Sequence, residues 1–391
     1  MAVIGEGTGL LRGPDNGRRV TFMELFFDLV YVLAVTQLAH LLLEHLTALG
    51  GLQTLLLLLA VWWAWVDTAW LTNWFDPDRP AVRMLLIAIM LLALVMSATL
   101  PDAYGDRGLL FAGAYAVMQV GRSAFAVAAL GGRPGLRRNF QRILAWRAAS
   151  AVLWIAGGVA DGAWRFGLWA AAVAVDYAAA ASGFRLPRLG RSTPADWPIT
   201  GEHLAERCQL FLMIALGESI LVTGTSFGAL ELSAANLAAF VCAFLGSVAL
   251  WWVYFDRSAE AATVVIARSD DPGRLGRSAY TYYHLPMVAG VIVAAVGDEL
   301  IIVHPGGQAS VATIVTVLGG PALFLAGHVL FKKAVFGRLS MPRLAAIAAL
   351  AVLVPVGLIV APLTLAFAAT LVVASVAVWD AWPAPVSRRR R

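Results

Sequence analysis

Acidic side chains occur inside segments of this chain that are otherwise apolar. Glu24 and Asp28 lie four residues apart in the stretch RRVTFMELFFDLVYVLAVTQLAHLLL, so both project from the same face of a helix. Gln37 follows further along the same stretch. Ionisable groups inside a membrane span are costly, and they usually face a protein interior or an aqueous cavity. We therefore expect a binding site or pathway within the membrane-spanning part of the protein.

A second acidic stretch, GEHLAERCQLFLMIALGESI, begins at Gly201, and Arg207 and Glu218 share one helical stripe within it. Glu218 follows Glu206 by twelve residues, about 18 Å at the rise of an α-helix, which places it near the bilayer midplane. A carboxylate at that depth is protonated, hydrated or paired with a cation, and Arg122 of another apolar segment is the candidate partner. Two interpretations stay open: a proton or cation site, or a structural carboxylate hydrogen-bonded between helices.

One further acid and two histidines lie inside apolar segments. We expect Asp176 to pair with Arg147 or Arg122, and His284 and His328 to be interior histidines. Metal sites in membrane helices need clustered ligands such as HExxH or paired ExxH, and the sequence has neither. The sequence therefore predicts no metal, no cofactor and no assignable catalytic residue.

The elements that must position these residues are membrane-spanning helices. Hydrophobic residues make up 60% of the 391 positions and charged residues only 14%, with a mean hydropathy of +0.77. A soluble domain carries roughly 25% charged residues. We predict an all-α polytopic membrane protein with about twelve spans, at 22–43, 50–72, 82–100, 109–130, 143–160, 164–183, 205–226, 233–255, 279–299, 310–331, 343–361 and 363–381.

The distribution of basic residues predicts the orientation of these spans. With both termini in the cytoplasm, all 29 Lys and Arg residues fall on cytoplasmic segments except Arg107, Arg165, Arg122 and Arg207. The sequence pI near 9.5 then reflects topology and contact with anionic lipid headgroups, and predicts no nucleic-acid partner. The basic tail Arg388–Arg391 is expected to anchor that topology.

Two short patterns recur at a similar separation along the chain. WWAWVD at Trp62–Asp67 corresponds to WWVYFD at Trp251–Asp256, and VAVD at Val173–Asp176 to VAVWD at Val376–Asp380. They predict two parallel six-helix repeats, with a site at their interface. The predicted parts are an N-terminal half at 1–183, a cytoplasmic linker at 184–204, a C-terminal half at 205–382 and a basic cytoplasmic tail at 383–391.

The same segments resemble the bacterial low temperature requirement protein A family. The resemblance rests on four motifs in order: ELFFDLVYVLAVTQL (Glu24–Leu38), HLAERCQLFLMIALGES (His203–Ser219), HLPMVAG (His284–Gly290) and GPALFLAGHVLFK (Gly320–Lys332). It implies a multi-pass protein of the bacterial inner membrane. It marks as family-typical, without roles, Glu24, Asp28, His203, Glu206, Arg207, Glu218, His284 and His328.

Three functions are compatible with these features. The sequence favours a transporter or channel-like protein for a small solute or ion, coupled to protons through intramembrane carboxylates. The alternatives are a membrane-embedded enzyme that modifies a lipid or isoprenoid, and a scaffold or sensor that transports nothing; the oligomeric state is not predicted. The candidate binding or transport residues are Glu24, Asp28, Gln37, Arg122, Asp176, Glu206, Arg207, Glu218, His284 and His328.

Overall fold

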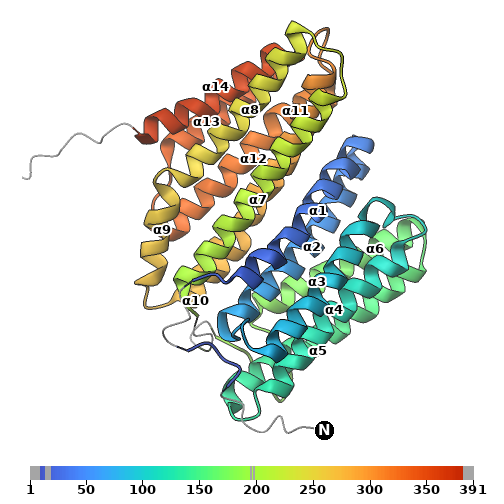
Figure 1. Cartoon of the computed structure of the whole chain (residues 1–391), viewed down its shortest axis with the longest axis vertical. Helices are drawn as coiled ribbons and strands as arrows, with labels where there is room; N and C mark the ends of the chain where they lie inside the picture. The colour runs from blue at the N-terminus through green and yellow to red at the C-terminus, as the bar shows by residue number, and fades with distance from the viewer. Residues whose placement is uncertain (1–8, 14–18, 194–195, 197–198, 382–391) are drawn as a thin grey trace, which may run out of the picture. The chain divides into compact units, whose positions relative to one another are not determined.

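The computed structural model describes residues 9–13, 19–193, 196 and 199–381 (Figure 1). Within these residues the regular structure is helical, and only isolated bridges, Leu11 with Phe75 and Leu186 with Gly190, have a β pattern. The predicted all-α class is confirmed. The predicted basic tail at 383–391 lies outside the described residues.

The helices follow one another with short connections, apart from the longer segment 182–200. Their bounds are α1 Phe22–Glu44, α2 Ala48–Trp74, α3 Pro80–Thr99, η1 Leu100–Asp102, α4 Gly108–Ala129, α5 Pro134–Val159, α6 Gly162–Ala181, α7 Gly201–Gly228, α8 Ala234–Phe255, α9 Ser258–Ala267, α10 Pro272–Leu275, a π-helical turn Gly276–Tyr282, α11 His284–Val303, α12 Val311–Phe336, α13 Met341–Gly357 and α14 Pro362–Ala381.

A multi-pass membrane architecture follows from the length and composition of these helices. In the described part of the chain, 10 helical segments are long and apolar enough to cross a membrane, and α13 is a shorter apolar helix. Large apolar side chains such as Leu91 and Leu221 are exposed on the helices, as a lipid-facing surface requires. Each of the twelve predicted spans coincides with a helix. Two of these helices are not among the 10 segments: α13, and α6, which carries Arg165 and Asp176. Twelve crossings therefore stay a prediction.

The helices form two compact units. Unit 1 consists of Met1–Ile214 and Ile266–Thr281, and unit 2 of Ala215–Val265 and Tyr282–Arg391. The division falls inside α7 rather than in the predicted linker. The two six-helix repeats therefore stay a prediction.

In unit 1, α1 packs on α2 and α3, α4 lies against α3 and α5, and α6 packs on α5 and α2. Thr21 begins α1 with a capping box, because its side chain accepts from the Glu24 backbone N–H while the Glu24 carboxylate accepts from the Thr21 backbone N–H. This cap fixes the helix start in the sequence and places Glu24 and Asp28 within the first two turns of α1.

In unit 2, the most extensive packing is between α11 and α12, and α14 packs on α8, α12 and α13. Glycines allow α11 and α12 to approach closely: a Cβ atom on Gly290 would lie 2.5 Å from the backbone nitrogen of Phe324, and one on Gly320 would lie 2.5 Å from that of Ala294. Small residues at helix contacts are the usual means of close packing in membranes.

Candidate functional site

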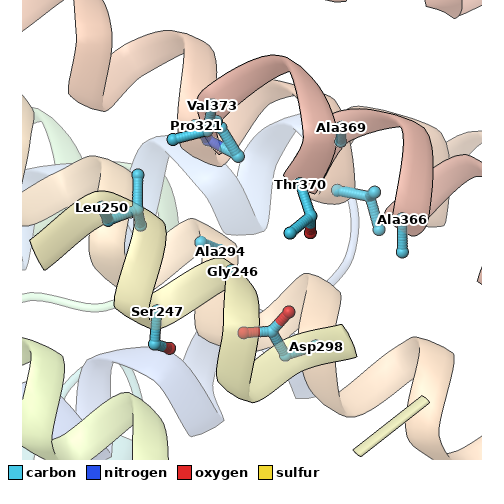
Figure 2. A pocket seen from close by; sticks show the side chains of 11 residues that line it. Gly246, Ser247, Leu250, Ala294, Asp298, Pro321, Ala366, Ala369, Thr370 and Val373 are labelled. Atoms are coloured by element: carbon cyan, nitrogen blue, oxygen red, sulfur yellow. The ribbon is translucent and has the colours of Figure 1, made fainter. Parts of the chain in front are cut away.

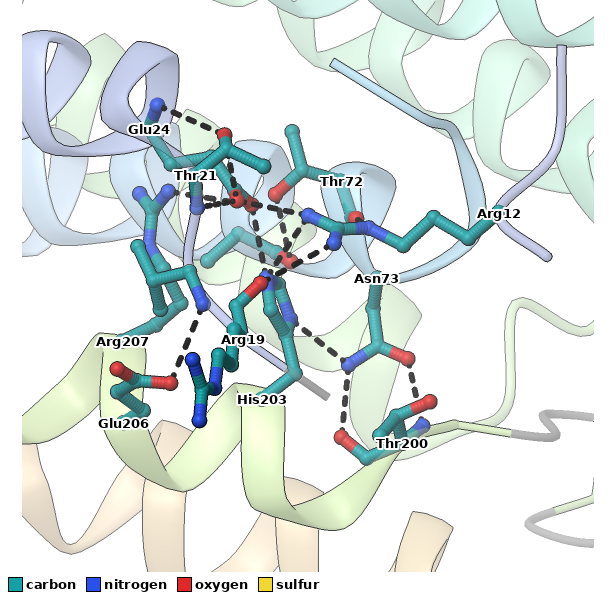
Figure 3. Close-up of polar contacts among 12 residues, drawn as sticks. Arg12, Arg19, Thr21, Glu24, Thr72, Asn73, Thr200, His203, Glu206 and Arg207 are labelled. Carbon is teal, nitrogen blue, oxygen red and sulfur yellow. Dashed lines mark hydrogen bonds and ion pairs between the residues drawn. The ribbon is translucent and has the colours of Figure 1, made fainter. Parts of the chain in front are cut away.

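The two acids of the first span lie among basic residues that come from other segments of unit 1. We call Arg12, Glu24, Asp28, His203 and Arg207 the α1–α7 cluster. Arg12 precedes α1, the acids lie on α1, and His203 and Arg207 lie on the first turns of α7. Figure 3 shows Arg12, His203 and Arg207 converging on Glu24.

Both oxygens of Glu24 are bonded, and the side chain is 1% exposed. Oε2 accepts from Arg12 Nη2 at 2.7 Å, from the Thr21 backbone nitrogen at 2.9 Å and from the Thr21 hydroxyl at 3.0 Å. Oε1 lies 2.8 Å from His203 Nε2 and 3.4 Å from Arg207 Nη1. Glu24 therefore holds the start of α1 against α7 and the segment that precedes α1.

Asp28 differs because only one of its oxygens is bonded. Oδ1 accepts from Arg207 Nη2 at 2.6 Å and from Trp65 Nε1 at 2.8 Å. Oδ2 is buried and has no hydrogen-bond partner among the described residues, and the same holds for Arg207 Nε. Most buried polar atoms in native proteins are satisfied. This carboxylate therefore keeps an unused acceptor position beside a guanidinium.

The hydrogen bonds of Asn73 assign the protonation of His203. The Thr200 backbone N–H donates to Asn73 Oδ1 at 2.7 Å, so the amide nitrogen of Asn73 is the group that lies 3.2 Å from His203 Nδ1. An amide nitrogen only donates, so Nδ1 accepts. Nε2 then carries the proton, which it donates to Glu24 Oε1 at 2.8 Å, and the ring is neutral. Arg12 Nη2 lies 3.1 Å from the same Nε2, but both groups are donors there, so Arg12 donates to Glu24 Oε2 instead.

With His203 neutral, the charges of the α1–α7 cluster balance, since two carboxylates face two guanidinium groups. The cluster is also walled by aromatic rings: the Arg207 guanidinium carbon lies 5.6 Å from the Phe27 ring centre and 5.8 Å from that of Trp65, and Phe211 lies 4.5 Å from Trp65. A neutral, ring-walled ion cluster is a state in which charges tolerate burial in a membrane protein.

Other candidates on the same two helices stand apart from the cluster. Glu206 is partly buried and accepts from the Val20 backbone nitrogen at 3.2 Å. Gln37 is partly buried and makes no hydrogen bond with the residues that the structure describes. Glu218 belongs to unit 2, is 6% exposed and has no hydrogen bond or ion pair within the described part of the chain.

A second buried charge network in unit 1 joins four helices. Arg147 of α5 contacts Asp67 of α2 at 2.6 Å and Asp176 of α6 at 2.6 Å. Arg122 of α4 contacts the same Asp67 at 2.9 Å and also binds Gln119 and Thr68. Arg147 is thus the partner of Asp176, and Arg122, the predicted partner of Glu218, pairs with Asp67 instead.

The two candidate histidines lie in unit 2 around shared aromatic rings. His284 Nε2 lies 2.7 Å from the Tyr254 hydroxyl, and the His328 ring centre is 5.7 Å from that of Tyr254. His328 Nδ1 accepts from Arg343 Nε at 3.2 Å, and both terminal nitrogens of Arg343 bind Asp380. No group of three His, Cys, Asp or Glu residues that could hold a metal occurs in the described ranges.

Several residues of these networks were absent from the sequence-based candidates. Arg12, Trp65, Asp67 and Arg343 each bind a candidate residue directly or through a shared partner. Trp65 and Asp67 lie in the repeated WWAWVD pattern, which is the signal that could have identified them. Arg12 lies in an irregular segment without periodicity, so no pattern identifies it.

Comparison with known proteins gives a family match over nearly the whole chain. Residues 19–378 match the profile of the family described as Bacterial low temperature requirement A protein (LtrA). An uncharacterised protein of Rhizobium meliloti (strain 1021) is 38% identical over 318 residues, which cover 81% of this chain and 77% of that protein. No solved structure matches the chain.

Proposed function

This chain belongs to the bacterial low temperature requirement A protein family, and we propose that it is a transporter or channel-like protein for a small solute or ion. In this proposal it resides in the bacterial inner membrane with both termini in the cytoplasm, in contact with anionic lipids. The observation that carries the proposal is the half-bonded Asp28 carboxylate, buried inside a candidate span beside Arg207.

Asp28 is proposed as a proton acceptor that controls Arg207. While Asp28 is ionised, Oδ1 holds Arg207 at 2.6 Å, and Oδ2 offers a free acceptor. A proton on Oδ2 neutralises the carboxylate, weakens the ion pair and leaves Arg207 with Glu24 at 3.4 Å. A guanidinium released in this way can bind an anionic group or shift α7 against α1, and either event couples proton uptake to movement of a solute.

The complete bonding of Glu24 supports a different role for that acid. Its interactions with Arg12, Thr21 and His203 keep the start of α1 in place whatever the charge of Asp28. Because Glu24 stays bonded, Asp28 can gain or lose a proton without unfolding the start of α1.

The buried histidines do not favour the enzymatic alternative. His284 faces the Tyr254 hydroxyl and His328 Nδ1 accepts from Arg343, and both side chains are fully buried within unit 2. Acid–base catalysis requires such groups to reach a substrate. No observation on the described residues supports that alternative over transport.

Proton flux into proteoliposomes tests the proposal. Wild-type protein is reconstituted with an internal pH dye, and a potassium gradient with valinomycin supplies the driving force. We expect acidification above that of protein-free vesicles, lost in Asp28→Asn, which keeps the side-chain shape and the Trp65 contact. Asp78→Asn, which alters an exposed pair with Arg83, is the matched control and keeps the wild-type flux.

Two outcomes contradict the proposal. The first is wild-type flux equal to that of empty vesicles across a panel of driving gradients and candidate solutes, which leaves only the non-transporting functions. The second is equal flux for wild type and Asp28→Asn, which removes Asp28 from the pathway.

A further inference from the structure

Unit 2 contains a cavity that is lined, among the described residues, by a single acidic side chain. The cavity lies between α8, α11, α12 and α14, and its volume is about 410 Å³ including the open mouth. Asp298 of α11 lines it and is partly buried. No hydrogen bond or ion pair joins Asp298 to any residue that the structure describes. Figure 2 shows Asp298, Ser247 and Thr370 on different helices around this space.

Two hydroxyl side chains line the cavity together with the carboxylate. Ser247 of α8 and Thr370 of α14 both line the cavity. Thr370 Oγ1 lies 3.7 Å from Cys242 Sγ, and Ser247 Oγ lies 3.4 Å from Ser219 Oγ. Each hydroxyl oxygen has two acceptor lone pairs, so these contacts leave capacity for a further ligand.

Pro321 adds a carbonyl oxygen to the wall. Proline has no backbone N–H, so the carbonyl four residues earlier in the helix loses its α-helical donor. Pro321 lies inside α12, and that carbonyl belongs to Val317. Both residues line the cavity. The Val317 carbonyl therefore lacks its α-helical donor, and it belongs to a residue that lines the same cavity as Asp298.

We propose that this cavity binds a small monovalent cation of the Na⁺ type, with ligands from the Asp298 carboxylate, the Ser247 and Thr370 hydroxyls and the Val317 carbonyl. These are hard oxygen donors carrying one negative charge, which suits a hard cation of one positive charge. Carbonyls released at helix irregularities are used in this way in membrane transporters. The remaining wall is apolar, formed by residues such as Leu250, Ala294 and Ala369, and offers an anion no donor.

The depth of the cavity fits a site reached from one membrane face. Asp298 lies five residues before the end of α11, about 8 Å along the axis, and Thr370 lies eight residues after the start of α14, about 12 Å. An ion at that depth loses part of its hydration, and the oxygen ligands replace it. The inference concerns unit 2 and does not depend on the role of Asp28.

Binding of ²²Na⁺ to the purified full-length protein tests this site. We expect saturable binding to the wild type, competed by unlabelled Na⁺ and not by choline. Asp298→Asn removes the only charged ligand and weakens binding about 10-fold or more. Glu299→Gln is the matched control, because Glu299 is the next residue on α11 and does not line the cavity.

Two further variants keep the carboxylate and test the other ligands. Thr370→Val removes a hydroxyl with little change in shape, and Pro321→Ala restores a backbone N–H that engages the Val317 carbonyl; each weakens binding about threefold. If Asp298→Asn fails to fold, these two variants decide the question. The proposal is overturned if the wild type binds no ²²Na⁺ above the choline background, or if every folded variant binds it like the wild type.

Discussion

At the scale of single residues, two acids on the same helix differ in their capacity to take up a proton or ligand because their surroundings differ. Glu24 and Asp28 are both buried, but Glu24 has partners at both oxygens and Asp28 at one. A fully bonded carboxylate is held in its ionised state, whereas a half-bonded one retains a position for a proton or ligand. This difference in bonding is why we assign an anchoring role to Glu24 and a switching role to Asp28.

Arg147 is expected to stabilise the protein strongly, because it forms ion pairs with both Asp67 and Asp176. Arg147→Met leaves Asp176 buried and uncompensated, which lowers the free energy of unfolding by roughly 3–5 kcal/mol. Unfolding in detergent mixtures with added denaturant measures the change. Arg83→Met is the control: its pair with Asp78 is exposed, so the change stays within about 1 kcal/mol. An equal loss of unfolding free energy in Arg147→Met and Arg83→Met would contradict the expectation that the buried ion pairs of Arg147 stabilise the fold.

The neutral tautomer assigned to His203 has a spectroscopic consequence. In protein labelled with ¹⁵N-histidine, we expect Nδ1 of His203 to resonate as an unprotonated nitrogen and Nε2 as a protonated one, because Asn73 donates to Nδ1. His203→Gln identifies the signal by its loss. Two protonated nitrogens at neutral pH would show a charged ring and a net positive α1–α7 cluster.

At the scale of helices, polar and small residues determine which apolar surfaces meet. Trp65 reaches from α2 to Asp28 on α1, and Arg122 reaches from α4 to Asp67 on α2. In a membrane the apolar faces of all helices are equally well solvated by lipid, so such bonds and close contacts determine pairing. Between α11 and α12, glycines determine the pairing because they allow a close contact of the two backbones.

Adjacent glycines on α12 should therefore respond differently to the same substitution. Gly320→Ala places a methyl group 2.5 Å from the Ala294 backbone nitrogen, so α11 and α12 must separate, at a cost of about 1–3 kcal/mol. At Gly319 the added Cβ would meet no atom of another helix within 4 Å among the described residues, so Gly319→Ala leaves stability unchanged or raises it by up to about 1 kcal/mol. Thermal unfolding in detergent compares the two. A lower melting temperature for Gly319→Ala than for Gly320→Ala would refute the close approach.

At the scale of the whole molecule, the predicted topology puts successive connections on opposite sides of the membrane. Arg79 lies in the connection before α3 and Arg83 in the first turn of α3, whereas the connection before α4 carries Arg107 alone. Basic residues remain in the cytoplasm during insertion. We therefore expect the first connection inside and the second outside.

Cysteine labelling of intact cells checks this orientation. Asp106→Cys reacts with an impermeant maleimide in intact cells, and Asp78→Cys reacts only after permeabilisation, since both positions are exposed at loop tips. The unmodified chain is a clean background because Cys208 and Cys242 are buried. Labelling of Asp78→Cys in intact cells with protection of Asp106→Cys would reverse the proposed topology.

The sequence by itself determined the properties that depend on local composition. Long apolar runs predicted the helices, and family motifs predicted the membership that the full-length match shows. It also singled out Glu24, Asp28 and Arg207, because charged residues are rare in apolar segments and a helical spacing puts neighbours on one face. His203 was marked only by the family motif in which it lies.

Only the tertiary structure decided which of these residues meet. Arg12 joins Glu24 from an irregular segment, Arg122 pairs with Asp67 rather than Glu218, and Asp298 lines a cavity formed by four helices. Helix order in the sequence does not specify these contacts, because pairing in a membrane depends on close packing and buried polar bonds between distant segments. The difference in hydrogen bonding between Asp28 and Glu24 also depends on the tertiary structure, because the groups that bond Glu24 come from residues as distant as Arg12 and His203.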